Sequence, residues 1–174
     1  LLGPRPTATA RGRAPEAERQ RSAELAVVGA VQRALAGLRE MQAVYDAVGE
    51  ALGRVFPKAD VGIRAFDLAA GLQRFPYLVE RGRRLQVGPL PLTDRGVSAH
   101  LRRTGQTLVI AENLAEATAA LGAAPPAGTT VEKSGVYVPL HWAGEVRGVV
   151  SVSDHEREHA FADTDVRLLE TLAA

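Results

Sequence analysis

Two apolar strands joined by a tight turn occupy the sequence from Ser134 to Asp154, and any fold of this chain must cover them. The first strand has the two-residue period of a pleated strand, in which Val136, Val138 and Leu140 alternate with Tyr137, Pro139 and His141. Ala143-Gly144 supplies a residue that tolerates positive φ where the chain must reverse. The second strand, Val146–Val152, is apolar on both faces, so we expect it to lie inside a sheet that is covered on both sides.

The composition excludes several classes of protein. The net charge is only +1 and the basic residues are spread along the chain, which argues against a nucleic-acid binder. No apolar stretch is long enough to cross a bilayer. The absence of cysteine excludes disulfides and thiolate chemistry from these residues, and it agrees with a reducing, cytoplasmic location.

Residues 1–20 differ in composition from the rest of the chain. They contain three prolines among arginine, alanine and glycine, and almost no large apolar side chain. Such a segment cannot bury enough surface to offset its ordering entropy, so we predict a disordered or linker segment there and a single domain over residues 21–174. The chain starts with Leu1 rather than methionine and ends inside a helical pattern, so we expect it to be a piece of a longer protein.

Helical spacing begins after this segment. Ser22 can cap a helix that runs to Leu38, and its apolar side chains recur at intervals of three and four, at Val28, Val31, Leu35 and Leu38. This spacing gives two heptads of a coiled-coil seam, which indicates a helix–helix contact. A second helix is predicted over Met41–Phe56 and ended by Pro57, with an inward face made by Val44, Val48, Leu52 and Val55.

Short elements are predicted for the rest of the chain. We expect strands over Asp60–Asp67, Leu72–Glu80, Leu85–Leu92 and Thr107–Ile110, a short helix over Gly96–Thr104, one or two helical turns followed by a loop within Glu112–Glu132, and a last helix carrying Val166, Leu169 and Leu172. Pro76 and Pro139 cannot donate to a strand ladder, which predicts edge positions or bulges there.

The order of these elements and four sequence blocks resemble a GAF domain, a sensory module of signalling proteins. The block Asp94–Ile110 is similar to the family's Gly-Ile-Ala-Gly…Thr-Gly-Gln…Ile stretch, and Gly135–Leu140, Gly144–Val152 and Phe161–Leu169 resemble the other three. The resemblance covers about Ser22–Ala174. It implies an α+β fold, a GAF-like antiparallel β-sheet with the N- and C-terminal helices packed on one face and a pocket of loops and a short helix on the other.

The resemblance also implies where a ligand would bind. By position in the family pattern, the ligand-binding residues would be Gly62, Glu80, Arg95, Val97, Ser98, Glu132, Ser134 and Tyr137. The backbone N–H groups of Val97 and Ser98 would point out of a helix N-terminus, which suits an anionic or carbonyl ligand. Ala99 stands where the family often has a second glycine, and Glu112 replaces a common aspartate, so the ligand is not named by the pattern. A purely structural role stays open for each of these residues.

Several ligand classes of the family lack their residues here. Cyclic-nucleotide-binding members carry an Asn-Lys…Phe…Asp-Glu signature, whereas Asn113, the one asparagine of this sequence, precedes a leucine. Bilin attachment and the methionine-sulfoxide reductase activity of some members both need a thiol, which this sequence lacks. Haem ligation through a histidine such as His100 stays open, so the cofactor is unknown.

One stretch matches a catalytic pattern letter for letter. His155-Glu156-Arg157-Glu158-His159 reads as the His-Glu-x-x-His of zinc hydrolases. That chemistry needs a helix that places both imidazoles on one face, together with a third metal ligand. Here the five residues fall between a predicted strand and a predicted helix, so we expect a connecting loop, no metal, and a zinc hydrolase only as a remote alternative.

The resemblance implies a non-catalytic regulatory sensor in a larger signalling protein, for example of a two-component system. It would bind a small molecule and pass the signal through terminal helices paired in a homodimer to an attached output domain, such as a histidine kinase or a cyclase. The alternative is the same fold without a ligand, serving as a dimerising connector. Compact apolar packing around Val97 and Tyr137 would favour the connector, and an enclosed polar cavity would favour the sensor.

Overall fold

The structure is a computed structural model that describes residues 13–123 and 131–174. The contacts within the chain group into two compact units, Leu1–Ala43 and Val44–Ala174. The helices are α1 (Arg13–Val55), α2 (Gly96–Thr104), α3 (Leu114–Ala120) and α4 (Asp163–Ala173). The strands are β1 (Asp60–Asp67), β2 (Leu72–Glu80), β3 (Arg83–Arg84), β4 (Leu90–Pro91), β5 (Leu108–Ile110), β6 (Ser134–Trp142) and β7 (Glu145–Asp154). The predicted strand over Leu85–Leu92 is therefore reduced to the two residues of β4.

Helix α1 is one continuous helix where two were predicted, and it starts earlier than Ser22. It begins at Arg13, inside the segment 1–20 that was predicted to be linker, and residues 1–12 lie outside the described part of the chain. The residues after Pro15 are alanine, glutamate, arginine and glutamine, which are strong helix formers, and Arg39-Glu40 joins the two predicted helices without a break. The helix propensity of residues 13–20 therefore indicates the observed helix, which the prolines and polarity of the segment 1–20 did not.

The inward face of the last turns of α1 also differs from the prediction. Tyr45, Val48, Leu52 and Phe56, at intervals of three and four, pack into the core, and Leu52 is fully buried. Val44 and Val55, which were predicted to face inward, are 54% and 51% exposed. The predicted inward positions Val48 and Leu52 are thus confirmed, whereas the aromatic residues Tyr45 and Phe56 take the places predicted for Val44 and Val55.

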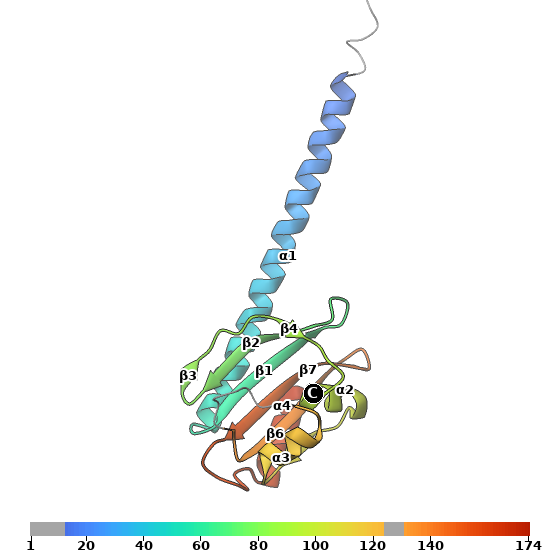
Figure 1. The fold of residues 1–174 in the computed structure, drawn as a ribbon. Coiled ribbons are helices and arrows are strands. Elements are labelled where there is room, and N and C mark those ends of the chain that lie inside the picture. The colour runs from blue at the N-terminus through green and yellow to red at the C-terminus, as the bar shows by residue number, and fades with distance from the viewer. Residues whose placement is uncertain (1–12, 124–130) are drawn as a thin grey trace, which may run out of the picture. The chain divides into compact units, whose positions relative to one another are not determined.

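One antiparallel sheet with strand order β3-β2-β1-β7-β6-β5 forms the centre of the unit Val44–Ala174, and β4 pairs with β2 (Figure 1). Strand β7 lies between β1 and β6, with Val152 opposite both Val61 and Val136. The predicted interior position of this strand is thus confirmed. Ala143 and Gly144 turn the hairpin with φ of 51° and 81°, as a two-residue turn with positive φ at both positions requires.

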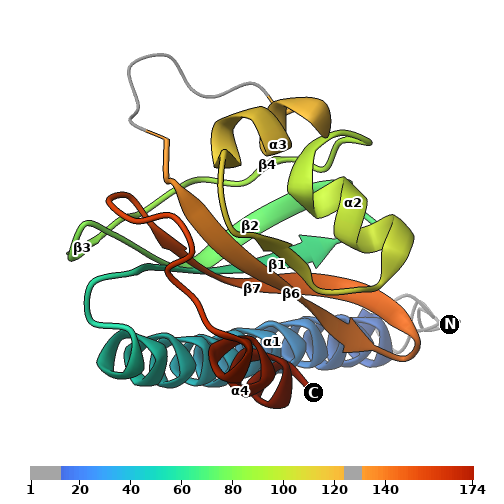
Figure 2. The same cartoon turned by 90° about the horizontal axis from the view of Figure 1, so that it is seen from below.

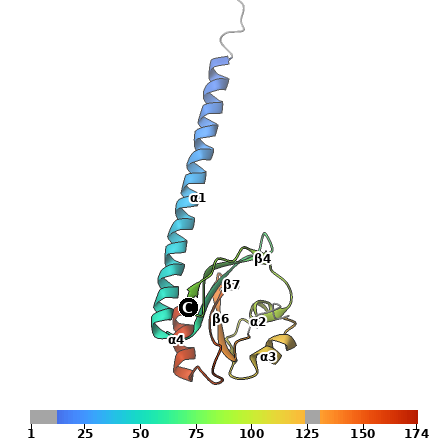
Figure 3. The same cartoon turned by 60° about the vertical axis from the view of Figure 1, so that its left-hand side comes forward.

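The two faces of the sheet are covered by different helices. The end of α1 and helix α4 lie on one face, and α2 and α3 lie on the other (Figures 2 and 3). Alternate residues of the central strands divide between the faces. The core beneath α1 and α4 contains Leu52, Phe56, Val61, Ile63, Val136, Val138, Val150, Val152 and Leu169. The core beneath α2 and α3 contains Phe66, Val97, Leu101, Ile110, Leu114, Tyr137, Val146 and Val149. The α+β, GAF-like arrangement predicted from the sequence is confirmed.

Pro76 of β2 and Pro139 of β6 lie where a missing donor is tolerated. Opposite Arg64, the register between β1 and β2 shifts, so that Phe75 and Pro76 bulge out between the paired residues Tyr77 and Arg74. Pro139 pairs with Val149 on one side, and on the other side it lies beyond the three residues of β6 that β5 covers. The bulge matters for the site because it occurs beside the Arg64 side chain.

Candidate functional site

A small polar cavity lies against the sheet, beside the ends of β1, β2, β6 and β7. It has a volume of about 190 Å³ and is lined by Asp60, Val61, Gly62, Arg64, Leu78, Glu80, Glu132, Tyr137, Ser151 and Ser153. Because one water molecule takes up about 30 Å³ of liquid, this volume holds about six of them or one small metabolite.

Its floor is made by the residues that alternate with the valine core. Gly62 and Arg64 of β1 face the cavity while Val61 and Ile63 belong to the core on the other face. Gly62 leaves room that no other residue would leave, because a Cβ there would lie 2.8 Å from the Ser151 hydroxyl oxygen. That hydroxyl donates to the Gly62 carbonyl oxygen at 3.4 Å.

Arg64 is the cation of the cavity wall. Its Nη1 donates to the Ser98 hydroxyl at 3.1 Å, and that hydroxyl donates to Gln73 Oε1 at 3.2 Å. Burial lowers the pKa of the Arg64 guanidinium, and Tyr137 and Glu132 oppose that shift. The hydrogen bond to Ser98 fixes the guanidinium in place beside the cavity.

Tyr137 brings a hydroxyl that stays protonated. Burial raises its pKa to about 12, the negative charge of Glu132 adds to that rise, and Arg64 opposes it. The ring packs in the core beneath α2 and α3 and is 6% exposed. Tyr137 therefore offers the cavity a neutral donor over the whole physiological pH range.

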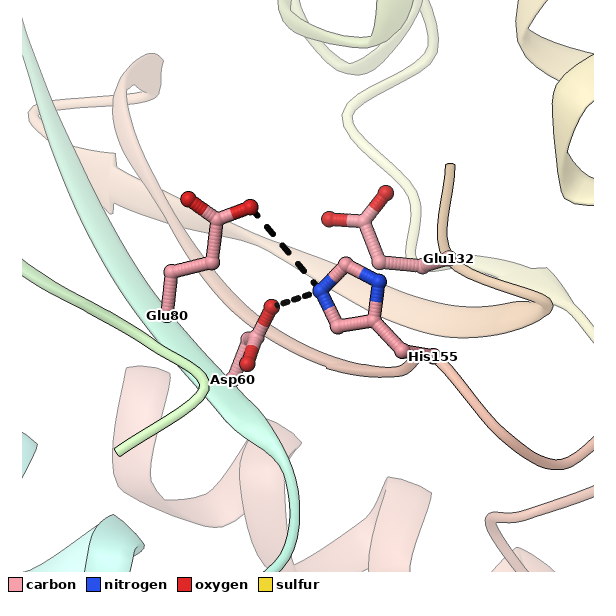
Figure 4. A group of neighbouring side chains, drawn as sticks. All are labelled: Asp60, Glu80, Glu132 and His155. Carbon is pink, nitrogen blue, oxygen red and sulfur yellow. Dashed lines mark hydrogen bonds and ion pairs between the residues drawn. The ribbon is translucent and has the colours of Figure 1, made fainter. Parts of the chain in front are cut away.

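A group of titratable side chains lies at one end of the cavity, formed by Asp60, Glu80, Glu132 and His155 (Figure 4). Each offers one ligand atom, and these atoms lie within 4.8 Å of one another. His155 Nε2 lies 2.6 Å from Asp60 Oδ2 and 3.9 Å from Glu80 Oε1. The other oxygen of Asp60 accepts the Arg81 backbone N–H at 2.7 Å, so the carboxylate of Asp60 is fixed on both sides.

The His-Glu-x-x-His segment is a loop, as predicted, and its two histidines point to different carboxylates. Asp154 Oδ1 accepts the backbone N–H groups of Glu156 and Arg157 at 2.8 Å each, which folds the chain into a turn directly after β7. His159 is largely exposed and lies 3.1 Å from Glu112 Oε2, whereas His155 is buried against Asp60. The helical zinc geometry of a hydrolase is absent from this described loop.

Asp154 is held in its charged form by the same turn. Burial opposes ionisation, but the two backbone N–H groups and the Arg157 guanidinium, at 2.9 and 3.1 Å, outweigh it and lower the pKa of Asp154. The Arg157 carbonyl oxygen in turn accepts the Ser134 hydroxyl at 2.7 Å. The turn thereby ties the start of β6 to the end of β7.

The eight residues expected to bind a ligand fall into two groups. Four of them line the cavity: Gly62, Glu80, Glu132 and Tyr137. The other four do not. Ser98 reaches the cavity only through Arg64, Val97 is part of the apolar core, Ser134 bonds to the loop, and Arg95 is an exposed residue at the start of α2. Ligand binding by any of them stays a prediction.

Sequence reasoning missed Asp60, Arg64, Ser151, Ser153 and His155. The signal for four of them was present in the period-two pattern. Asp60 and Arg64 lie two residues on either side of Gly62, and Ser151 and Ser153 are polar residues that alternate with the valines of a buried strand. The role of His155 had no local signal, because its partner Asp60 is 95 residues away in the sequence.

Comparison with protein families decides the family. The sequence pattern of the GAF domain matches residues 39–174, which is most of the chain. The chain belongs to the GAF domain family. No curated protein sequence matches it significantly.

Solved structures agree with this GAF assignment. A methyl-accepting chemotaxis protein, residues 122 to 287, is 26% identical, with a TM-score of 0.55 over 76% of this chain and 82% of that one. The GAF domain of an Acinetobacter phosphoenolpyruvate-protein phosphotransferase is 18% identical, with a TM-score of 0.58 over 73% and 74%. A type II free methionine-R-sulfoxide reductase of Thermoplasma acidophilum is also 18% identical, with a TM-score of 0.59 over 76% and 86%. The last two likenesses establish the fold of this GAF domain.

Among the helices of residues 13–123 and 131–174, none combines sufficient length with sufficient hydrophobicity to cross a bilayer.

Proposed function

We propose that this GAF domain is a regulatory sensor that binds a small polar molecule in the cavity between Arg64 and Tyr137. The observation that carries the proposal is a preorganised guanidinium facing a cavity of about 190 Å³. A guanidinium held by Ser98 recognises a carboxylate or carbonyl group of a ligand, and the neutral Tyr137 hydroxyl donates a second hydrogen bond. The volume restricts the ligand to the size of a small metabolite.

The experiment is native mass spectrometry of the chain purified from the cells that produce it. We expect a retained small molecule in the wild type, loss of that molecule in Arg64→Gln, and retention in Arg103→Gln, whose exposed arginine donates to the Asp94 carbonyl oxygen outside the cavity. Retention in Arg64→Gln that equals the wild type would contradict the proposed site.

A ligand-free connector is the second candidate, and the packing supports it in part. Val97 and Tyr137 belong to one compact apolar core, as the connector predicts, and the cavity is small. If the wild type retains no molecule and no member of a metabolite panel raises its melting temperature, the connector is the better description.

Reductase activity is the enzymatic alternative suggested by the structural neighbours. The 174 residues contain no cysteine, so the chain supplies no thiol to reduce a sulfoxide. We therefore propose a non-catalytic role. An assay for consumption of free methionine sulfoxide by the purified chain tests it, and turnover would overturn it.

We further propose that the N-terminal part of α1 pairs with a second copy of the chain. Val28, Val31, Leu35 and Leu38 lie on one stripe of the helix and are each more than half exposed, at 53%, 52%, 52% and 67%. A stripe of this kind in a heptad register matches the seam of a two-stranded coiled coil. In a longer signalling protein, such pairing would carry the signal between the sensor and an output domain such as a histidine kinase or a cyclase.

Light scattering coupled to size-exclusion chromatography tests the pairing. Leu35→Glu places a charge in the seam and should shift a dimer to a monomer, whereas Ala26→Glu introduces the same charge on the opposite side of the helix and should not. Identical masses for the two variants and the wild type would contradict pairing through this stripe.

A further inference from the structure

The group formed by Asp60, Glu80, Glu132 and His155 joins side chains from four separate places in the sequence. Asp60 starts β1, Glu80 ends β2, Glu132 lies just before β6, and His155 follows β7. The antiparallel pairing of Asp60 with Ser153 brings β1 and β7 into register at this edge. The result is one imidazole and three carboxylates whose ligand atoms lie within 4.8 Å of one another (Figure 4).

We propose that these four residues bind a divalent transition-metal cation. Three carboxylates placed this close together repel one another, and a divalent cation is the partner that neutralises them at one point. The Asp60 side chain is only 8% exposed, so solvent screens the repulsion poorly at that carboxylate, whereas Glu80 is 41% exposed. The proposal does not depend on an organic ligand in the cavity.

A second observation comes from the imidazole itself. His155 is nine-tenths buried, and its Nδ1 is buried without a hydrogen-bond partner among the described residues. Figure 4 shows Nε2 directed at Asp60 and Glu80, and Nδ1 on the side of Glu132. A buried polar nitrogen without a partner costs free energy, and a cation coordinated by the ring removes that cost.

The arrangement also provides the orienting contact that metal-binding histidines have. Such a histidine binds the metal through one ring nitrogen, and the N–H of the other nitrogen donates to a carboxylate or a carbonyl. Here the Asp60 carboxylate accepts at Nε2 and orients the ring, which leaves Nδ1, on the side of Glu132 and without a hydrogen-bond partner among the described residues, to take the cation. Asp60 is itself fixed by the Arg81 N–H, so the donors are preorganised.

A cation can enter the group from either of two hollows. The small cavity is lined by Asp60, Glu80 and Glu132. A larger hollow of about 710 Å³ on the other side is lined by Asp60 and His155 together with the loop residues Glu156 and Arg157. The group therefore combines buried donors with access to solvent.

The donor set indicates which cation fits. One imidazole with carboxylates suits Zn²⁺ and Mn²⁺, whereas Mg²⁺ prefers oxygen ligands and keeps most of its water. Affinity at such sites rises from Mn²⁺ to Zn²⁺ along the first row. This site differs from a His-Glu-x-x-His centre, because it uses His155 alone and leaves His159 with Glu112.

Isothermal titration calorimetry of the whole chain, treated with a chelator and dialysed, tests the proposal. We expect one equivalent of Zn²⁺ to bind, Mn²⁺ to bind more weakly, and Mg²⁺ to bind most weakly. His155→Gln and Glu132→Gln should each weaken Zn²⁺ binding by at least about tenfold. His159→Gln is the matched control and should bind as the wild type does.

Melting temperatures supply the second measurement, because a metal that binds only the folded state raises the melting temperature. Zn²⁺ should raise it equally for the wild type and for His159→Gln, and by less for Glu132→Gln, so Glu132→Gln tests the site even if His155→Gln does not fold. The proposal is overturned if the wild type binds no stoichiometric Zn²⁺ at millimolar concentration. It is also overturned if His159→Gln loses as much Zn²⁺ affinity as His155→Gln and Glu132→Gln do. Neither result depends on a metabolite being retained, so the sensor proposal is tested separately.

Discussion

The stability of this GAF domain should fall at alkaline pH because of Tyr137. The pKa of Tyr137 rises from 10.0 to about 12 in the folded chain because the hydroxyl is buried and lies near Glu132. Below pH 10, the side chain is protonated in both the folded and the unfolded state and contributes no pH dependence. Between pH 10 and pH 12, the unfolded chain loses the proton first, so unfolding releases a proton and becomes easier as the pH rises.

The magnitude follows from the same two pKa values. Each tenfold change in a proton equilibrium corresponds to about 1.4 kcal/mol, so Tyr137 should cost roughly 2–3 kcal/mol of unfolding free energy across this interval. Tyr137→Phe keeps the ring in the core and removes the ionisable hydroxyl. The loss should therefore occur in the wild type and be absent from the variant.

Urea unfolding followed by circular dichroism at a series of pH values measures the difference between the two chains. The difference isolates Tyr137 from other groups, including Tyr45, whose pKa is also raised by burial. The absorbance of tyrosinate, recorded for both chains, should show that the tyrosine which ionises in the most alkaline part of the wild-type titration is missing from the titration of Tyr137→Phe. A difference in unfolding free energy that stays constant from pH 9 to pH 12 would refute the reasoning about burial.

Three further predictions concern packing and the loop. Gly148→Ala should lower the unfolding free energy by about 1–3 kcal/mol, because its Cβ would meet the Arg64 carbonyl oxygen. Gly53→Ala in α1, with open space around it, should be neutral or stabilising. Thermal unfolding of the two variants measures the contrast. Leu52→Ala, at a fully buried position, should cost about 2–5 kcal/mol by urea unfolding, and a cost near zero would contradict its place in the core. Asp154→Asn should cost about 2 kcal/mol at neutral pH. Because the pKa of Asp154 is lowered, its contribution in the wild type is complete above the ordinary aspartate pKa and is lost as the pH falls below it, so wild type and variant should converge in acid.

The sequence predicted the sheet better than the helices because strand periodicity is a local signal. The bounds of β1 and β2 follow from alternation, and the structure confirms them, whereas β7 extends beyond the predicted Val146–Val152 at both ends. Helix α1 was predicted in two pieces, and Val44 and Val55 were wrongly placed on its inward face, because composition and aliphatic spacing were given more weight than helix propensity and aromatic side chains.

The candidate site could be predicted only in part, because it is assembled by pairing between distant strands. Gly62, Glu80, Glu132 and Tyr137 came from a family pattern, and that pattern carries no information on their neighbours in this chain. The contact between Asp60 and His155 spans 95 residues and depends on the register of β1 against β7. No local motif encodes such a register, whereas the local His-Glu-x-x-His pattern pointed to a metal centre with the wrong second histidine.

Adjacent residues of each central strand face opposite sides of the sheet, so a single strand connects the two faces. Gly62, Ser151 and Tyr137 line the cavity, and their chain neighbours Val61, Val152 and Val136 support the helical layer. A strand that tilts on the cavity side also moves its adjacent side chains on the side of α1 and α4. If a ligand binds in the cavity as proposed, adjacent residues of the same strand connect the cavity directly to the core beneath α1 and α4.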